Sequence, residues 1–259
     1  MNATVVDHAP SVELIAALNE TARACRILEI NGHGDKIFGH VAMRDPEGRG
    51  FWMKRHMVSL GEIVDWRDFL LLDFDGLKLF GDGASHSEWP IHSEIMLARP
   101  DLNYSCHSHP FHGVIYSSIP VPLNPIKVTL AGAPPRYEGS SELILDKEQG
   151  AAVAAAMGKA STVFLRNHGV AFAGATHVDL VLTGIELEHN CHQVLTANGS
   201  GFGWEWPSEE EQRRKFSDGR NRGRGSPLYD YYCRQLARAE AQGDPRLATK
   251  SVWDSDNGV

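Results

Sequence analysis

The sequence predicts an α/β protein built around a mixed sheet. In the first half of the chain the expected strands are joined in hairpins, whereas in the second half helices separate them. Hairpins join antiparallel strands, and helices between strands allow parallel pairs, so the two patterns together indicate a mixed sheet. With 259 residues, the chain is long enough to bury a substantial core around a sheltered pocket.

Helices are predicted by apolar periodicity and by residues that start or stop a helix. In the first helix apolar residues recur at three- and four-residue steps. Pro90 and Pro100 bound the second, because proline is tolerated in the first turn but not inside. Thr176 and Asp179 have the spacing of a capping box. The expected helices are Ser11–Ile30, Ser87–Arg99, a short segment after Pro110, Asp146–Gly158, Thr176–Gly199 and Pro227–Gln242.

Strands are predicted where apolar and β-branched residues cluster between turn signals. Asp75-Gly76, for example, would connect two short strands as a hairpin. The proline-rich segment Ile119–Tyr137 is expected to be loop with room for one short strand. The expected strands are Phe38–Arg44, Phe51–Lys54, Leu70–Phe74, Leu77–Phe80, Asn103–His107, Thr162–Arg166 and Val170–Ala173.

The C-terminal part of the chain differs in character. Trp204–Gly225 carries an acidic block, a basic block and a Gly/Arg-rich stretch, which together predict a solvated linker. We therefore expect a main domain over residues 1–203. Residues 204–259 would form a linker and a helix that packs on that domain or on a neighbouring subunit.

Composition excludes several classes of protein. The net charge of −8 argues against a nucleic-acid binder, because phosphate contacts need a basic face. The N-terminus lacks the apolar stretch of a signal peptide, and no apolar run is long enough to span a membrane. The four cysteines form no CxxC motif, so we expect reduced thiols and a cytoplasmic protein.

The 13 histidines are unusual, and their spacing indicates a metal site. His107 and His109 flank Ser108, and residues two apart on a strand share a face, so both imidazoles could reach one ion. His168, in a turn before a glycine, is the natural third ligand. Three protein ligands with an open position are typical of catalytic metal sites, and zinc and manganese both accept imidazole. The alternative is that the pair shares a strand face by accident.

Glu88 begins the second expected helix. An acidic residue there favours the helix dipole by about 0.3–1 kcal/mol, which is a sufficient structural reason for it. The functional alternative is a carboxylate beside the metal, serving as general acid/base or as a displaceable ligand.

Three motifs in this order resemble the class II aldolase/adducin family: Ser85-His86-Ser87-Glu88-Trp89, DLNYSCHSHPFH and VFLRNHGVAFAG. The resemblance covers approximately residues 11 to 200. It implies a three-layer α/β/α sandwich with a largely antiparallel central sheet, and a homotetramer or larger homo-oligomer. It also implies one divalent metal ion per subunit, Mn²⁺ or Zn²⁺, on His107, His109 and His168, with Glu88 as the acid/base.

The sequence departs from the sugar-phosphate members where those bind phosphate. Their phosphate-binding segments correspond here to Gly39–Ala42 and Phe51–Arg55, and one serine before the glutamate is replaced by a histidine. Aromatic, imidazole and cationic side chains suit a flat ring that carries carboxylates. The residues expected to bind such a substrate are Lys54, Arg55, His40, His86 and Trp52.

These replacements resemble the branch of the family that decarboxylates hydroxylated aromatic or pyridine dicarboxylates. Its examples are the 3-hydroxy-2-methylpyridine-4,5-dicarboxylate 4-decarboxylase of vitamin B6 breakdown and the dihydroxyphthalate decarboxylases. We therefore expect a metal-dependent lyase that loses CO2 through an enolate stabilised by the ion. The alternatives are an aldolase or dehydratase acting on a sugar or sugar phosphate, and a non-catalytic scaffold like adducin. Two further residues have open roles: His112 could orient a metal ligand, and Arg166 could pair with an acid near the metal or merely end its strand.

Overall fold

The fold is organised by one eight-stranded sheet, as a computed structural model describes it for residues 10–124, 126, 132–221 and 225–254. The strand order is β4-β3-β2-β1-β5-β8-β7-β6, and only the β6–β7 pair is parallel. The mixed, mostly antiparallel sheet that the sequence predicts is confirmed. Its strands are β1 His40–Arg44, β2 Phe51–Lys54, β3 Phe69–Leu72, β4 Lys78–Phe80, β5 Tyr104–Ser108, β6 Arg136–Tyr137, β7 Thr162–Leu165 and β8 Gly169–Gly174.

The predicted helix starts agree with the observed caps. Ser11 accepts a hydrogen bond from the Leu14 amide, and Thr176 and Asp179 form the capping box. Within the described residues, no helix has both the length and the apolar character required to cross a membrane. The helices are α1 Val12–Leu28, α2 Trp89–Ala98, α3 Phe111–Ser117, α4 Lys147–Met157, α5 His177–Gly199, α6 Glu209–Asn221 and α7 Gly225–Ala241, with shorter turns at Glu29–His33, Leu60–Glu62, Trp66–Asp68 and Val252–Asp254.

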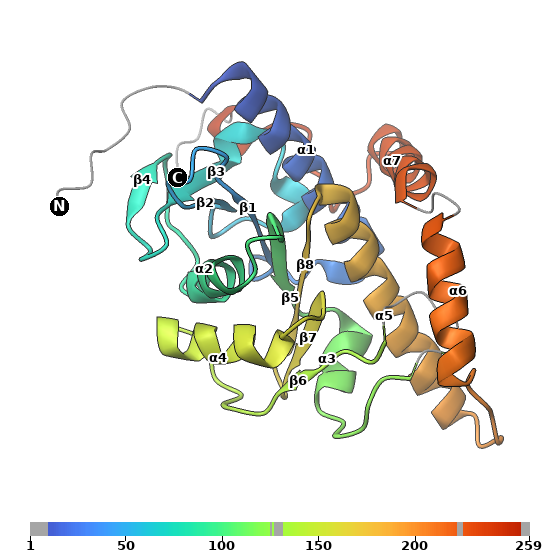
Figure 1. The fold of residues 1–259 in the computed structure, drawn as a ribbon. Helices are drawn as coiled ribbons and strands as arrows, with labels where there is room; N and C mark the ends of the chain where they lie inside the picture. The colour runs from blue at the N-terminus through green and yellow to red at the C-terminus, as the bar shows by residue number, and fades with distance from the viewer. Residues whose placement is uncertain (1–9, 125, 127–131, 222–224, 255–259) are drawn as a thin grey trace.

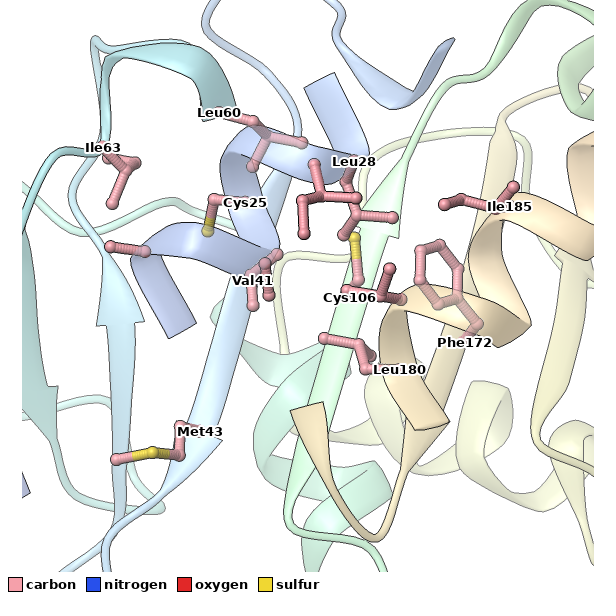
Figure 2. Packing of buried hydrophobic residues seen from close by; sticks show 14 of the residues in the cluster. Cys25, Leu28, Val41, Met43, Leu60, Ile63, Cys106, Phe172, Leu180 and Ile185 are labelled. Atoms are coloured by element: carbon pink, nitrogen blue, oxygen red, sulfur yellow. The ribbon is translucent and has the colours of Figure 1, made fainter. Parts of the chain in front are cut away.

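Alternating strand residues separate the core into clusters on opposite faces of the sheet. On β8, Phe172 packs with α1 and α5, whereas Ala171 and Ala173 pack with α2 and α4. Figure 2 shows the first cluster, where Phe172, Leu180 and Ile185 face Leu28 and Cys106. Helices therefore cover both faces, with α2 against α4 on one side and α1 beside α5 on the other (Figure 1).

One expectation for the C-terminal part is wrong. Glu209–Asn221, placed within a predicted linker, is the helix α6. The charge blocks fit a helix because Ser208 and Glu211 exchange hydrogen bonds at its start and Glu209 lies 3.6 Å from Arg213 one turn on. The following helix α7 packs against α1 and α5 of the same chain.

Candidate metal centre and active site

The site forms where β5 ends beside the turn between β7 and β8. Strand β5 pairs with β8, so His107 lies opposite Ala171 and the His168 turn reaches the end of β5. Asn167 adopts a left-handed conformation (φ 54°) in this turn. At Gly169 a Cβ would lie 2.6 Å from the His109 ring, so only glycine permits this close approach.

Glu88 joins the histidines from the opposite side, as the N-cap residue of α2. One potential ligand atom from each of Glu88, His107, His109 and His168 lies within 4.8 Å of the others. The Nε2 atoms of His107 and His109 are 3.1 Å apart, and the carboxylate of Glu88 lies 3.5 Å from His107 Nε2 and 3.7 Å from His168 Nε2. The structure thus brings together all four residues that the motifs single out.

The hydrogen bonds of two histidines fix the tautomers that a cation needs. His107 Nδ1 lies 3.0 Å from the Val170 carbonyl, which can only accept, and His109 Nδ1 lies 3.0 Å from the Asp35 carboxylate. Both Nδ1 atoms therefore carry the proton in the neutral rings. The two Nε2 lone pairs then face each other across 3.1 Å, an arrangement that a shared cation would stabilise. The donor set fits a divalent ion such as zinc or manganese.

The pKa values agree with ligands that are ready to bind. Burial, reinforced by His107, lowers the pKa of His109 and that of His168 to about 4, so both rings are neutral at pH 7. Burial opposes ionisation of Glu88, but His107, His168 and the Ile144 amide outweigh it and hold its pKa at about 2. The His109 and His168 rings and the Glu88 carboxylate therefore face one point without needing to lose protons.

The cluster opens into a cavity of about 730 Å³. Its wall combines imidazole rings and other polar groups with an apolar part. The apolar part consists of Phe38, Phe111, Val114, Ile115 and Leu143. The polar part consists of Asp35, His40, His56, His86, Ser87, Glu88, His109, Asn167 and His168. Among the described lining residues there is no lysine or arginine.

Two of the predicted substrate contacts, His40 and His86, line this cavity. Both are buried, and their rings lie 4.5 Å apart. Sequence analysis assigned no role to His56, whose ring centre lies 4.5 Å from that of His86 and which extends the imidazole wall. It also missed Asp35, whose place in an irregular loop carries no periodic signal.

The other three predicted substrate contacts lie outside the cavity lining. Trp52 is in the core, where its indole donates to Asp45, so it does not face a substrate ring. Lys54 is fully buried and donates to the carbonyls of Val58 and Arg55. Arg55 stacks on Trp253, 4.3 Å from the ring centre. Their placement does not support the expected direct contact with substrate, because Trp52 and Lys54 are buried on the interior strand β2 and Arg55 lies against Trp253.

The two residues with open roles have other partners. His112 bonds Glu188 at 2.7 Å, and Asp35 rather than His112 contacts a candidate ligand. Arg166 donates to the Gly139 carbonyl at the end of its strand.

The fold and the histidine cluster define an α/β protein with a candidate metal site, and comparison with known proteins gives its family. Residues 19–195 match the family model described as the class II aldolase and adducin N-terminal domain. The chain belongs to this family.

Relatives with decarboxylase names are similar to the chain. A 3,4-dihydroxyphthalate decarboxylase of Arthrobacter keyseri is 29% identical over 195 residues, covering 70% of this chain and 78% of the relative. A protein of the same name from a Terrabacter species is 30% identical, covering 69% and 81%. The solved L-fuculose 1-phosphate aldolase of Glaciozyma antarctica PI12 has a TM-score of 0.76 and 23% identity, covering 94% of this chain and 97% of that one, and shows the shared fold alone.

Proposed function

We propose that this protein is a metal-dependent lyase that decarboxylates a hydroxylated aromatic or pyridine dicarboxylate. The substrate class is the one suggested by the names of its dihydroxyphthalate decarboxylase relatives. The ion would be Zn²⁺ or Mn²⁺, one per subunit, held by His107, His109 and His168 with Glu88 beside it.

The observation that carries the proposal is the composition of the cavity wall. Five apolar side chains, two of them phenylalanines, face the space next to the histidine cluster. A planar ring can bury its faces against them. A sugar phosphate would instead place those of its hydroxyl groups that face this apolar part against side chains without hydrogen-bonding atoms, which costs free energy for each unpaired group. It would also find no lysine or arginine for its phosphate among the described lining residues.

The positive charge of Lys54, which lies behind the cavity wall, would stabilise the second carboxylate of the substrate. Burial first, and the positive charge of Lys54 second, lower the pKa of His56 and that of His86, the latter to about 2. The charge of Lys54 is therefore effective at these rings although its ammonium group does not reach the cavity. An anionic carboxylate beside His56 would be stabilised by the same charge.

When bound, the ion would act as a Lewis acid that favours ionisation of the substrate hydroxyl and withdraws charge from the ring. Glu88 supplies the proton transfer. With its pKa near 2 it begins as a carboxylate, so Glu88 first takes the hydroxyl proton on Oε2. It then gives this proton to the ring carbon that carries the departing carboxylate. The bond to that carboxylate breaks, CO2 leaves and the electron pair restores the ring.

The Ile144 amide keeps Glu88 in place for this transfer. It donates to Oε1 at 2.9 Å, which leaves Oε2 turned to His107. The bond fixes the carboxylate where it can serve both the hydroxyl and the ring carbon.

The test is a CO2-release assay on the full chain, stripped of metal and reconstituted with Zn²⁺ or Mn²⁺. Hydroxylated phthalates and pyridine dicarboxylates are the trial substrates, and L-fuculose 1-phosphate is the trial aldol substrate. We expect metal-dependent CO2 release that His109→Ala abolishes. The exposed His192, outside the cavity, provides the control His192→Ala, which should keep activity. Cleavage of the sugar phosphate without CO2 release from any ring acid would overturn the proposal.

Three further features belong to the same proposal. Helices on both faces of the sheet support the three-layer α/β/α sandwich, with residues 1–203 as the catalytic domain and the helix α7 of the C-terminal part packed on it. Large apolar side chains exposed at the cavity mouth, Phe111 and Leu143 among them, support a homo-oligomer, for which the resemblance suggests a tetramer. Four free cysteines support a cytoplasmic location.

A further inference from the structure

Two buried imidazole nitrogens of cavity-lining residues have no hydrogen-bond partner among the described residues. They are Nε2 of His40 and Nε2 of His86. Both side chains are almost completely buried, with 1% and 4% of their surface exposed. A buried polar atom without a partner is costly, so such atoms mark a place where a ligand group supplies the missing bond.

The role of His40 follows from a chain of short hydrogen bonds behind it. His40 Nδ1 lies 2.6 Å from His92 Nε2, and His92 Nδ1 lies 2.6 Å from the Ser105 hydroxyl. Within the described residues, His92 Nδ1 is the hydrogen-bond partner of the buried Ser105 hydroxyl, and a hydroxyl proton that is satisfied there makes Ser105 the donor and His92 the acceptor. His92 then carries its proton on Nε2 and donates to His40 Nδ1. His40 is left with its own proton on Nε2, the atom without a partner.

The role of His86 is the opposite one. The backbone carbonyl of Arg55 is a hydrogen-bond partner of the His86 ring. A carbonyl can only accept, so the ring nitrogen that faces it carries the proton. Because Nε2 has no partner, that nitrogen is Nδ1, and Nε2 keeps its lone pair.

We propose that His40 and His86 together recognise a hydroxyl group on the substrate ring, His40 as hydrogen-bond donor and His86 as acceptor. The two rings are 4.5 Å apart, close enough to share one oxygen atom. A hydroxyl both accepts and donates, so it satisfies both nitrogens. A carboxylate at this position would meet the lone pair of His86, and a C–H group would leave both nitrogens unpaired.

This inference rests on the proposed function for the ring, and it narrows the substrate class. The ring would carry one hydroxyl beside the departing carboxylate and a further hydroxyl at the His40–His86 pair. An analogue without that second hydroxyl should bind roughly 10-fold to 100-fold more weakly, as expected when buried polar groups lose their partners.

The tautomers can be tested without any substrate. The full chain, labelled with ¹⁵N and loaded with diamagnetic Zn²⁺, is studied by long-range ¹H–¹⁵N NMR of the imidazole rings. Signals are assigned from the variants His40→Gln and His86→Gln. We expect the proton of His40 on Nε2 and that of His86 on Nδ1. The reverse tautomer at either ring would overturn the assignment of donor and acceptor.

Recognition of the hydroxyl is tested by calorimetry on the Zn²⁺-loaded protein. The probes are the 2,3-, 2,4-, 2,5- and 2,6-dihydroxybenzoates, with 2-hydroxybenzoate as the reference. At least one isomer should bind roughly 10-fold more tightly than the reference, and His86→Leu should remove this preference. His86→Gln, which keeps an acceptor oxygen, should restore part of it, while the exposed His192→Leu leaves it unchanged. Metal content is measured for each variant.

An equal preference in wild type and His86→Leu, with equal metal content, would refute the pair as the hydroxyl site. The result of this binding test is independent of the CO2-release test of the proposed function. A protein that shows the hydroxyl preference and releases no CO2 from any ring acid would refute decarboxylation and leave the His40–His86 assignment standing.

Discussion

Replacement of Lys54 by methionine should make the stability of the protein less dependent on pH in the alkaline range. The Lys54 ammonium is fully buried, and its partners are two neutral carbonyls, those of Val58 and Arg55. Burial lowers its pKa from 10.5 to about 8, an effect that neighbouring groups including Cys25 only partly oppose.

The magnitude follows from the two pKa values. One pKa unit corresponds to about 1.4 kcal/mol, so burial of the charged amine destabilises the fold by about 3 kcal/mol at pH 7. The pKa is lower in the folded state, so the unfolded chain binds more protons between pH 8 and 10.5 and stability increases as pH rises. From pH 7 to pH 9 the wild type should gain about 1 kcal/mol from this residue, because the penalty falls as the folded-state amine loses its proton.

The assay is urea unfolding of wild type and Lys54→Met at pH 7 and pH 9. The difference between their free energies of unfolding should shift by about 1 kcal/mol in favour of the wild type at the higher pH. Lys78, exposed on β4, provides the matched control Lys78→Met, for which no such shift is expected. If the difference in free energy of unfolding between wild type and Lys54→Met is the same at both pH values, the ammonium is not buried as described. A direct contact of Lys54 with substrate would then be the better explanation.

Three predictions concern the metal centre. His107→Ala should lose stoichiometric metal, as measured by mass spectrometry of the purified protein, and retained metal would place the ion elsewhere. Glu88→Gln should lower kcat for CO2 release by about 10² to 10⁴-fold because proton transfer is lost, whereas Glu94→Gln on the same helix should not; near-normal kcat would leave Glu88 with only its structural role. Asp35→Asn should weaken metal affinity by about 10 to 100-fold in a competition titration, because Asp35 holds the tautomer of His109. An unchanged affinity would contradict that role.

The sequence alone determined most of the elements and the four residues of the candidate metal site. Their signals are local: alternation on a strand places His107 and His109 together, a turn of fixed composition carries His168, and the start of a helix positions Glu88. Such signals depend on residues close in the chain. The prediction of a linker over Trp204–Gly225 was wrong for Glu209–Asn221, because charge blocks are typical of both a solvated helix and a linker.

Only the tertiary structure decided which polar side chains line the cavity and which lie behind it. Asp35 meets His109 across 74 residues of sequence, and His40 meets His92 across 52. Lys54 follows a strand pattern that allows either face, and the packing of β2 inside the sheet buries its ammonium. Alternation along a strand predicts which residues share a face, but the partner that faces them depends on which distant segments pack together, and no local pattern contains that information.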